Sequence, residues 1–186
     1  GTPADFIRLY GCPVGCFFCD TGYAFPDGDY YKKKLPKKSM EIEEIVSELK
    51  SPLAVITGGE PFIHKSLPKL CEAILETGRM VSIETSGSSW KPIPDDVFVT
   101  LSPHEHISPK YPVLDIFWKR ANEFKLVVYD KSEFEYYKNK LKEYKGLKYF
   151  SPEHESSDSN QFAMELLMAN KDFKLSLQTH KFVGLP

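Results

Sequence analysis

Short, mostly apolar runs alternate with amphipathic stretches along most of the chain. The apolar runs are bounded by Gly, Pro or polar residues, and this pattern predicts buried strands. The predicted strands cover residues 6–9, 53–57, 80–85, 97–101, 124–128, 147–150 and 173–177. Apolar residues at helical spacing predict helices between them: one with Ser39 as N-cap, one over residues 67–75 with Gly78 as C-terminal cap, and others over residues 132–144 and 162–168.

Alternation of strands and helices predicts a parallel sheet, because parallel neighbours need a crossover connection of a dozen or more residues. A closed eight-unit barrel typically needs about 250 residues, whereas this chain has 186. We therefore expect an α/β fold with a partial, open β/α barrel and a mostly parallel sheet. Because no linker, internal repeat or low-complexity tract divides the sequence, we expect one domain over residues 1–186.

Polar and glycine-rich segments directly follow several of these strands. They comprise Cys12 and residues 57–60, 84–87, 102–104 and 178–180. The carboxyl ends of parallel strands meet at one edge of the sheet, where α/β proteins bind ligands. The sequence therefore predicts one mouth lined by these segments.

Composition and charge exclude some classes of function. The chain is 41% hydrophobic and 27% charged, which is typical of a soluble globular protein. No apolar run approaches the about 20 residues of a membrane span, and no signal-peptide pattern opens the chain. The formal net charge is -2, whereas a protein that wraps nucleic acid needs an excess of positive charge. The basic run at residues 32–38 is therefore expected to be a solvated face. We expect a cytoplasmic protein with a small-molecule substrate and no membrane or nucleic-acid partner.

Three of the four cysteines form a C-x-x-x-C-x-x-C motif at Cys12, Cys16 and Cys19. Disulfides are rare in a reducing compartment, so the motif indicates either zinc or an iron–sulfur cluster. Structural zinc needs a fourth ligand, from Cys71 or a histidine. Cys71 lies on the apolar face of the predicted helix at 67–75, where a cysteine acts as a small hydrophobe. Three thiolates leave one iron of a cluster open, which indicates chemistry rather than a structural staple.

This motif resembles the cluster loop of radical S-adenosylmethionine enzymes, and residues 58–61 are similar to the G-G-E-P segment of that superfamily. The resemblance implies that the three cysteines hold a 4Fe–4S cluster, whose fourth iron is chelated by the methionine moiety of S-adenosylmethionine. It also implies that Gly58, Gly59 and Glu60 lie at the amino group of that moiety.

Four segments narrow the resemblance to the 7-carboxy-7-deazaguanine synthase family: residues 6–12, 19–21, 84–87 and 177–181. The resemblance implies a carbon–nitrogen lyase of queuosine and 7-deazapurine biosynthesis. Its reaction would be a radical ring contraction of 6-carboxy-5,6,7,8-tetrahydropterin to 7-carboxy-7-deazaguanine with release of ammonia. It also implies a homodimer and an electron donor such as flavodoxin or ferredoxin.

The same resemblance assigns roles to single residues. Arg8 and Thr57 would bind the substrate, where an arginine fork suits a carboxylate, and Thr21 would bind Mg²⁺. Further residues would contact S-adenosylmethionine: Phe18, Cys19, Asp20, Ser86, Ser102, Pro103 and His104. Residues 108–110 also match the Ser-Pro-Lys segment of the family, but residues 102–104 are preferred because they follow a strand. Residues 151–154 are a further candidate contact of the cofactor. The radical reaction requires no acid–base side chain, so neither His180 nor Lys181 is expected to be catalytic.

Each of these residues also has a structural interpretation. Arg8 could form an ion pair, Thr21 could be a turn hydroxyl, and Glu60 could be a solvated surface glutamate. The α-carboxylate of Pro186, close after the last predicted strand, is expected to accept hydrogen bonds from the 2-amino group and ring N–H of the pterin. In the family, a strand with a Gln-Gly-Glu-Gly loop normally comes before this part of the chain; it is either absent here or lies outside residues 1–186.

Two other functions remain open at this stage. A radical activating enzyme for a glycyl-radical partner would share the cluster, but it should lack the ending at residues 177–181. A non-enzymatic zinc-binding module would contain zinc in place of iron and sulfide.

Overall fold

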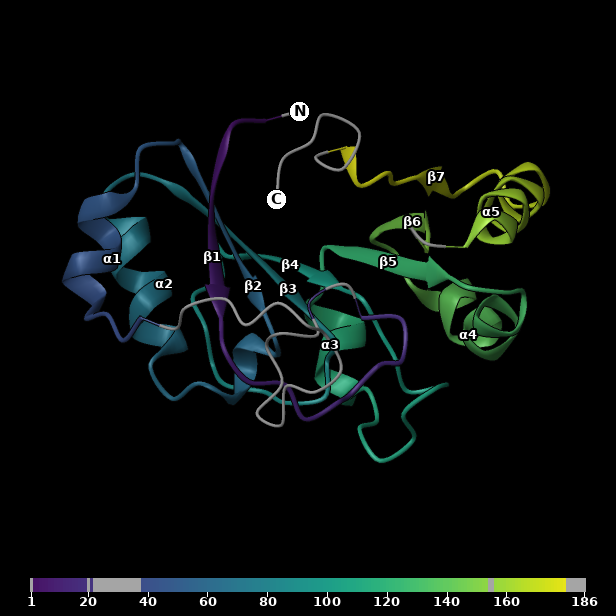
Figure 1. The fold of residues 1–186 in the computed structure, drawn as a ribbon, viewed down its shortest axis with the longest axis horizontal. Coiled ribbons are helices and arrows are strands. Elements are labelled where there is room, and N and C mark those ends of the chain that lie inside the picture. Colours follow the sequence, from purple (N-terminus) through teal and green to yellow (C-terminus); the bar gives the residue numbers. More distant parts are fainter. Residues whose placement is uncertain (1, 20, 22–37, 154–155, 180–186) are drawn as a thin grey trace.

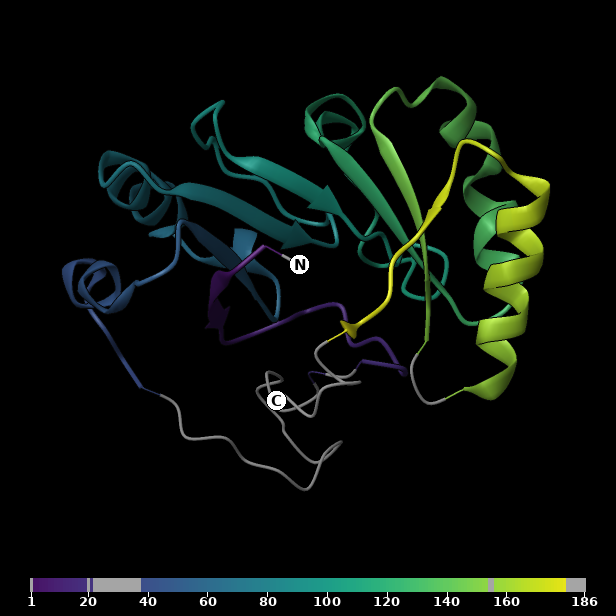
Figure 2. The ribbon, with the colours of Figure 1, turned by 90° about the horizontal axis from the view of Figure 1, so that it is seen from above.

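The computed structural model describes residues 2–19, 21, 38–153 and 156–179. Its strands form one sheet in which each strand pairs in parallel with its neighbour in sequence, from the first to the seventh (Figure 1). The strands are β1 (Ala4–Leu9), β2 (Leu53–Gly58), β3 (Met80–Thr85), β4 (Phe98–Leu101), β5 (Glu123–Val128), β6 (Leu147–Pro152) and β7 (Lys174–Leu175). The sheet is curved but not closed, which confirms the predicted open barrel (Figure 2).

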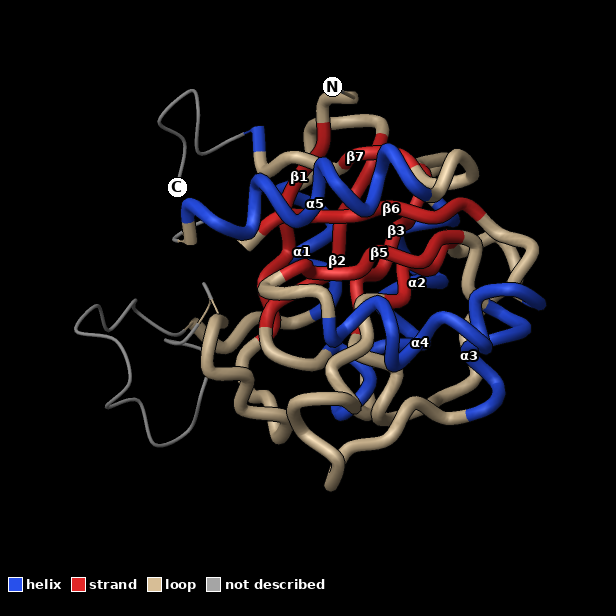
Figure 3. The backbone as a smooth tube through the Cα atoms, turned by 90° about the vertical axis from the view of Figure 1, so that its right-hand side faces the viewer, coloured by secondary structure: helices blue, strands red, loops and turns tan. Residues whose placement is uncertain are grey.

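The helices lie along the outer, convex side of the sheet (Figure 2). They are α1 (Ile42–Glu48), α2 (Leu67–Glu76), α3 (Asp115–Arg120), α4 (Ser132–Glu143) and α5 (Ser157–Ala169), with a short 3-10 helix η2 (Pro61–Ile63). Helix α4 contacts β5 and α5 contacts β6, so these two helices cover one end of the sheet (Figure 3). Of the helices described, none is long and apolar enough to cross a bilayer.

The two faces of the sheet differ because successive side chains of a strand point to opposite sides. The outer face is apolar, and its central side chains have no exposed surface; they include Ile56, Ile83, Val99, Phe124 and Leu126. The strand register aligns polar residues on the inner face: Arg8 pairs with Thr57, Glu84 with Thr100, and Thr100 with Glu123. Since Ile56 pairs with Ile83, Thr57 and Glu84 are also level. We call Arg8, Thr57, Glu84, Thr100 and Glu123 the polar row.

Several predicted elements have different bounds, among them two helices and the last strand. Helix α1 has Glu41 as its N-cap, so the prediction of Ser39 is wrong. Helix α5 begins at Ser157 rather than near 162, because Ser156 caps it and its first turn is polar. The last strand is limited to Lys174–Leu175. Helix α3 was not predicted, since six residues are too few to show a helical period.

Candidate active site

The cysteine motif lies in the loop that leaves β1, at the carboxyl edge of the sheet. In this loop the exposed residues alternate with more buried ones. Pro13 and Phe17 are exposed, whereas Cys12, Cys16 and Cys19 are each half-buried and form no disulfide. The loop therefore brings three partly buried cysteines together on a short stretch of chain.

These thiols fit an iron–sulfur cluster. Burial raises the pKa of Cys12. Burial also raises the pKa of Cys16, and the negative charges of Cys19 and Cys12 raise it further, so the three sulfur atoms lie within electrostatic reach of one another. Such a set of thiolates needs cations to be stable, and in a cluster each thiolate binds its own iron. Within the described ranges, no three His, Cys, Asp or Glu side chains are grouped to hold a single metal ion.

The segment after β2 packs directly onto the cysteine loop. Gly59 N donates to Leu9 O at 2.8 Å, and Glu60 N donates to Gly11 O at 2.8 Å. A Cβ atom on Gly59 would lie 1.9 Å from the Gly11 oxygen, and Gly58 has a φ of +136°. Both positions therefore require glycine. The backbone at these glycines therefore lies directly against the cysteine loop.

Glu60 joins this segment to the end of β3. Its side chain is 1% exposed. Oε1 accepts from Thr85 Oγ1 at 2.6 Å and from Phe62 N at 3.1 Å, while Oε2 accepts from Ser86 N at 2.8 Å and Ser86 Oγ at 2.6 Å. Burial raises the pKa of Glu60, and these hydrogen bonds act in the opposite direction. The interpretation as a solvated surface glutamate is wrong: with four donors on two oxygens, Glu60 holds two loops together.

Three residues expected at the substrate and Mg²⁺ lie together. Arg8 and Thr57 are partners in the register of β1 and β2. Arg8 Nη1 donates to Thr21 Oγ1 at 2.7 Å, and Thr21 is 7% exposed. Thr21 N also donates to Cys19 Sγ at 3.4 Å, which ties these residues to the cysteine loop. Thr21 therefore lies in a turn, and its side chain is buried against the Arg8 guanidinium.

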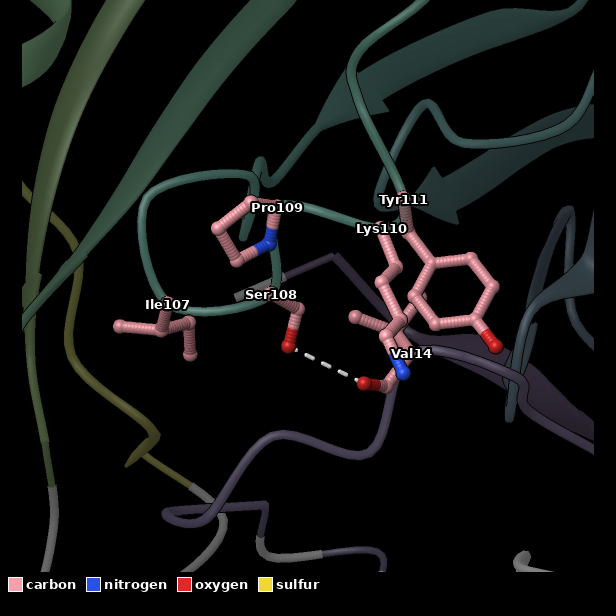
Figure 4. Close-up of a pocket in the computed structure, with 6 residues that line it drawn as sticks. All are labelled: Val14, Ile107, Ser108, Pro109, Lys110 and Tyr111. Atoms are coloured by element: carbon pink, nitrogen blue, oxygen red, sulfur yellow. Dashed lines mark hydrogen bonds between the residues drawn. The ribbon is translucent and has the colours of Figure 1, made fainter.

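Both Ser-Pro segments after β4 contact the cysteine loop. The His104 ring lies edge-on to Phe18, with centroids 5.5 Å apart. Burial lowers the pKa of His104 to about 4, and the positive charge of Lys125 lowers it in the same direction, so the ring is neutral at neutral pH. In the second segment, Ser108 Oγ donates to Val14 O at 3.0 Å (Figure 4). This contact borders a shallow pocket of about 250 Å³, lined by Val14 and residues 107–111.

The sequence analysis missed a charged cluster on the inner face. Lys125 Nζ lies 2.7 Å from Glu84 Oε1, and Thr100 Oγ1 lies 3.5 Å from Glu123 Oε1. Burial raises the pKa of Glu123 and the nearby Glu84 acts in the same direction, whereas Lys125 lowers it. The signal that could have revealed it is the alternation of charged and apolar residues in Glu123-Phe124-Lys125-Leu126, of which the predicted strand at 124–128 leaves out Glu123.

Some expected site residues lie outside the described part of the chain. These are Asp20, His154, His180, Lys181 and Pro186, together with residues 32–37 of the basic run. Their assignments stay predictions.

Comparison with known proteins agrees with this geometry. The Radical SAM superfamily matches residues 6–100, and the chain therefore has the fold and cysteine motif of a radical S-adenosylmethionine enzyme. The 7-carboxy-7-deazaguanine synthase of Escherichia coli (strain K12) is 31% identical over 212 residues, which cover 100% of this chain and 91% of that protein. That of a Synechocystis species is 29% identical, covering 100% and 85%. The chain belongs to the 7-carboxy-7-deazaguanine synthase family of radical S-adenosylmethionine enzymes.

Solved structures give the same result. The crystal structure of QueE from Escherichia coli matches with a TM-score of 0.78 and 30% identity, over 96% of this chain and 86% of that one. Streptococcus suis SuiB, at 10% identity and a TM-score of 0.60, covers 94% of this chain and 49% of its own, and shares the fold alone. Family membership implies a 4Fe–4S cluster and S-adenosylmethionine as cofactors. Neither the activating enzyme nor the zinc module is retained as an interpretation.

Proposed function

We propose that the chain converts 6-carboxy-5,6,7,8-tetrahydropterin to 7-carboxy-7-deazaguanine with release of ammonia, for queuosine or another 7-deazapurine. The observation that carries this proposal is the juxtaposition of Arg8, Thr57 and Thr21 beside the cysteine loop. The substrate has one carboxylate, and this group of side chains offers a guanidinium and two hydroxyls to it. A flavodoxin- or ferredoxin-like electron donor and a homodimeric assembly belong to the same proposal.

In this proposal Cys12, Cys16 and Cys19 ligate the cluster. The cluster and S-adenosylmethionine, when bound, supply the radical that abstracts a hydrogen atom from the substrate. The chain's own contribution is to bind and orient. Gly59 and Ser86 border the cofactor through backbone that Glu60 fixes, because that carboxylate holds both loops.

The remaining cofactor contacts come from the loops around the cysteines. In the proposal they are Phe18, Asp20, Ser102, Pro103 and His104. The ring of His104 is neutral, so it adds no positive charge beside the sulfonium of S-adenosylmethionine, which is already cationic. The contact between His104 and Phe18 supports a position for this histidine at the cysteine loop.

Arg8 receives the substrate carboxylate through its guanidinium fork, and Thr57 offers a hydroxyl on the neighbouring strand. Arg8→Lys keeps the charge but loses the fork. We expect it to weaken substrate binding while S-adenosylmethionine binding stays nearly unchanged, as measured by calorimetric titration of each ligand. Equal loss of both ligands would mean that Arg8 has a structural role.

Thr21 supplies one oxygen to Mg²⁺, which usually keeps several waters and takes few protein ligands. Its buried position next to Arg8 supports this role, because Mg²⁺ there would lie near the substrate carboxylate. We expect Thr21→Val to retain its iron and to lose the gain in substrate affinity that Mg²⁺ gives the unaltered protein. If Mg²⁺ still strengthens substrate binding in Thr21→Val, another residue binds the ion.

The α-carboxylate of Pro186 accepts the two parallel N–H donors of the pterin in this proposal. Proline fixes one backbone dihedral and so limits the entropy lost when the chain end is held. Extending the chain by Gly-Ser should leave cluster assembly intact while substrate affinity falls sharply. Unchanged affinity would exclude this role.

The overall proposal is tested on anaerobically reconstituted protein with S-adenosylmethionine, a reductant, Mg²⁺ and 6-carboxytetrahydropterin. We expect the pterin to be consumed with formation of one equivalent each of 7-carboxy-7-deazaguanine and ammonia, measured by mass spectrometry and an ammonia assay. Cys16→Ala is the matched control without a complete cluster. A reconstituted protein with full iron content that leaves the pterin unchanged would contradict the proposal.

A further inference from the structure

A partly buried ion pair lies on the inner face of the sheet, and the proposed function gives it no task. It joins Lys125 of β5 to Glu84 of β3, with 2.7 Å between Nζ and Oε1. The side chain of Lys125 is 18% exposed and that of Glu84 is 38% exposed. A lysine ammonium withdrawn from water to this extent needs a compensating partner, and the pair spans the intervening strand β4 to provide it.

Strand register puts this pair next to the proposed substrate residues. Glu84 is in the polar row with Thr57 and Arg8, two strands from Arg8. Lys125 lies two residues after Glu123 and points to the same face. It is therefore the next inner-face residue of β5 after the polar row, in the direction of the carboxyl edge. That edge carries the cysteine loop, and a ligand held by Arg8 and Thr57 at the mouth would therefore lie near the ion pair.

The ammonium of Lys125 interacts with three ionisable side chains around it. It pairs with Glu84, lowers the pKa of Glu123 against the effect of burial, and lowers the pKa of His104 in addition to the effect of burial. Without the ammonium, Glu84 and Glu123 would repel each other in one layer of the sheet. The Glu84 side chain, which is more exposed than Lys125, would then turn toward solvent.

We propose that Lys125 is a positioning residue whose ammonium fixes the Glu84 carboxylate in the polar row beside Arg8 and Thr57, so that the substrate meets a row already in its bound arrangement. A preorganised site loses less conformational entropy on binding and therefore binds more tightly. The inference rests on the proposed function in one respect, namely that the substrate binds on this inner face.

The chain contains a matched control for this lysine. Lys148 of β6 also forms an ion pair, 2.6 Å from Asp172 Oδ2, and its side chain is 13% exposed. It pairs in register with Phe124, so it points to the opposite side of the sheet from Lys125. Removing either ammonium breaks an ion pair of similar geometry, but only Lys125 lies on the face of the polar row.

The experiment measures substrate affinity by calorimetric titration of 6-carboxytetrahydropterin into reconstituted protein with S-adenosylmethionine bound. We expect Lys125→Met to bind the substrate at least tenfold more weakly, with iron content unchanged, and Lys125→Arg to recover most of the loss. Lys148→Met should bind as the unaltered protein does. In the Glu84→Gln background, Lys125→Met should produce little further loss, because the two residues act as one unit.

Several results would overturn the inference: unchanged affinity in Lys125→Met, additive losses in the double variant, or a loss of iron that accompanies the loss of affinity. If Lys125→Met does not fold, as judged by its thermal unfolding, Lys125→Gln replaces it under the same criteria. The outcome is separable from that of the proposed function. Failure of the unaltered protein to bind the pterin refutes the proposed function, whereas its binding together with equal binding by Lys125→Met refutes only the role of Lys125.

Discussion

The two faces of the sheet divide stability from chemistry. On the outer face Ile56, Ile83 and Phe124 have no exposed surface and belong to the hydrophobic core. On the inner face the same strands present Thr57 and Glu84, one residue further along. Because the side-chain period of a strand is two, a slip of one residue in register would exchange the two sets. The apolar outer face therefore fixes the register that assembles the polar row.

The largest difference between the two faces is expected for the cysteines, where one substitution should abolish the cluster and the other should leave it intact. Cys71 belongs to α2 on the outer side and is 0% exposed, whereas Cys16 lies in the loop at the mouth. Cys16→Ala should lose the cluster and all turnover, as measured by iron content and product formation. Cys71→Ala should keep both and lose only stability, since it deletes a small buried side chain. Loss of iron in Cys71→Ala with retention in Cys16→Ala would reverse the ligand assignment.

A second pair of variants compares one residue of each face, Leu126 of β5 and Thr57 of β2. Leu126 is 0% exposed on the outer face, and Leu126→Ala should cost about 2–5 kcal/mol of unfolding free energy by leaving a cavity. Thr57→Val on the inner face keeps the side-chain volume and removes one hydroxyl. It should change unfolding by about 1 kcal/mol or less but weaken substrate binding. Urea unfolding and substrate titration of both variants check this; a large loss of stability in Thr57→Val would contradict the division.

The outer face was predictable from the sequence to a large extent. The run at residues 80–85 matches β3 in full, and the helix predicted at 67–75 ends one residue early. Such elements bury several adjacent or periodic apolar residues, which is the signal that a pattern in one sequence can show. Helix α3 lacks that signal because it is short.

The candidate site was predictable only where a motif carries it. The cysteines are close in sequence, and so are Gly58, Gly59 and Glu60. The polar row is different: each of its strands contributes one or two polar residues, and only the register across five strands aligns them. The burial of Glu60 was missed for a related reason, since three of its four hydrogen-bond donors come from Thr85 and Ser86 at the end of β3, 25 and 26 residues further along the chain.

Glu60 follows β2 and binds the end of β3, and its substitution should affect both stability and cofactor binding. In Glu60→Gln one carboxylate oxygen becomes an amide NH₂, which cannot accept from its two donors. We expect a loss of about 1–3 kcal/mol from unsatisfied buried groups, together with weaker S-adenosylmethionine binding because both loops loosen. Urea unfolding and cofactor titration measure the two effects. Glu44→Gln, on a side chain that is 43% exposed, is the control and should change neither. Equal stability of the two variants would show that the Glu60 bonds contribute little.

The last comparison concerns an acid on the outer side that should influence stability alone. Glu133, in the first turn of α4, is 5% exposed, and its Oε2 accepts from Asp130 N at 3.2 Å. Burial raises the pKa of Glu133 to about 7, and the negative charge of Asp130 contributes in the same direction. The folded state therefore holds a proton on Glu133 that the unfolded state releases near its ordinary pKa of 4.5.

Because the folded state binds more protons between these two values, stability from this group falls as pH rises from about 4.5 to about 7. Glu133→Gln cannot titrate and still accepts the Asp130 amide. Its melting temperature relative to that of the unaltered protein should rise from pH 5 to pH 8, and about 1 kcal/mol corresponds to about 2–4 °C in a chain of this size. At each pH, Glu133→Gln and the unaltered protein should bind the substrate with the same affinity, since Glu133 lies on the helix side of the sheet. If the difference in melting temperature does not change with pH, Glu133 does not titrate in this range. If the variant and the unaltered protein bind the substrate with different affinities, the two faces are coupled.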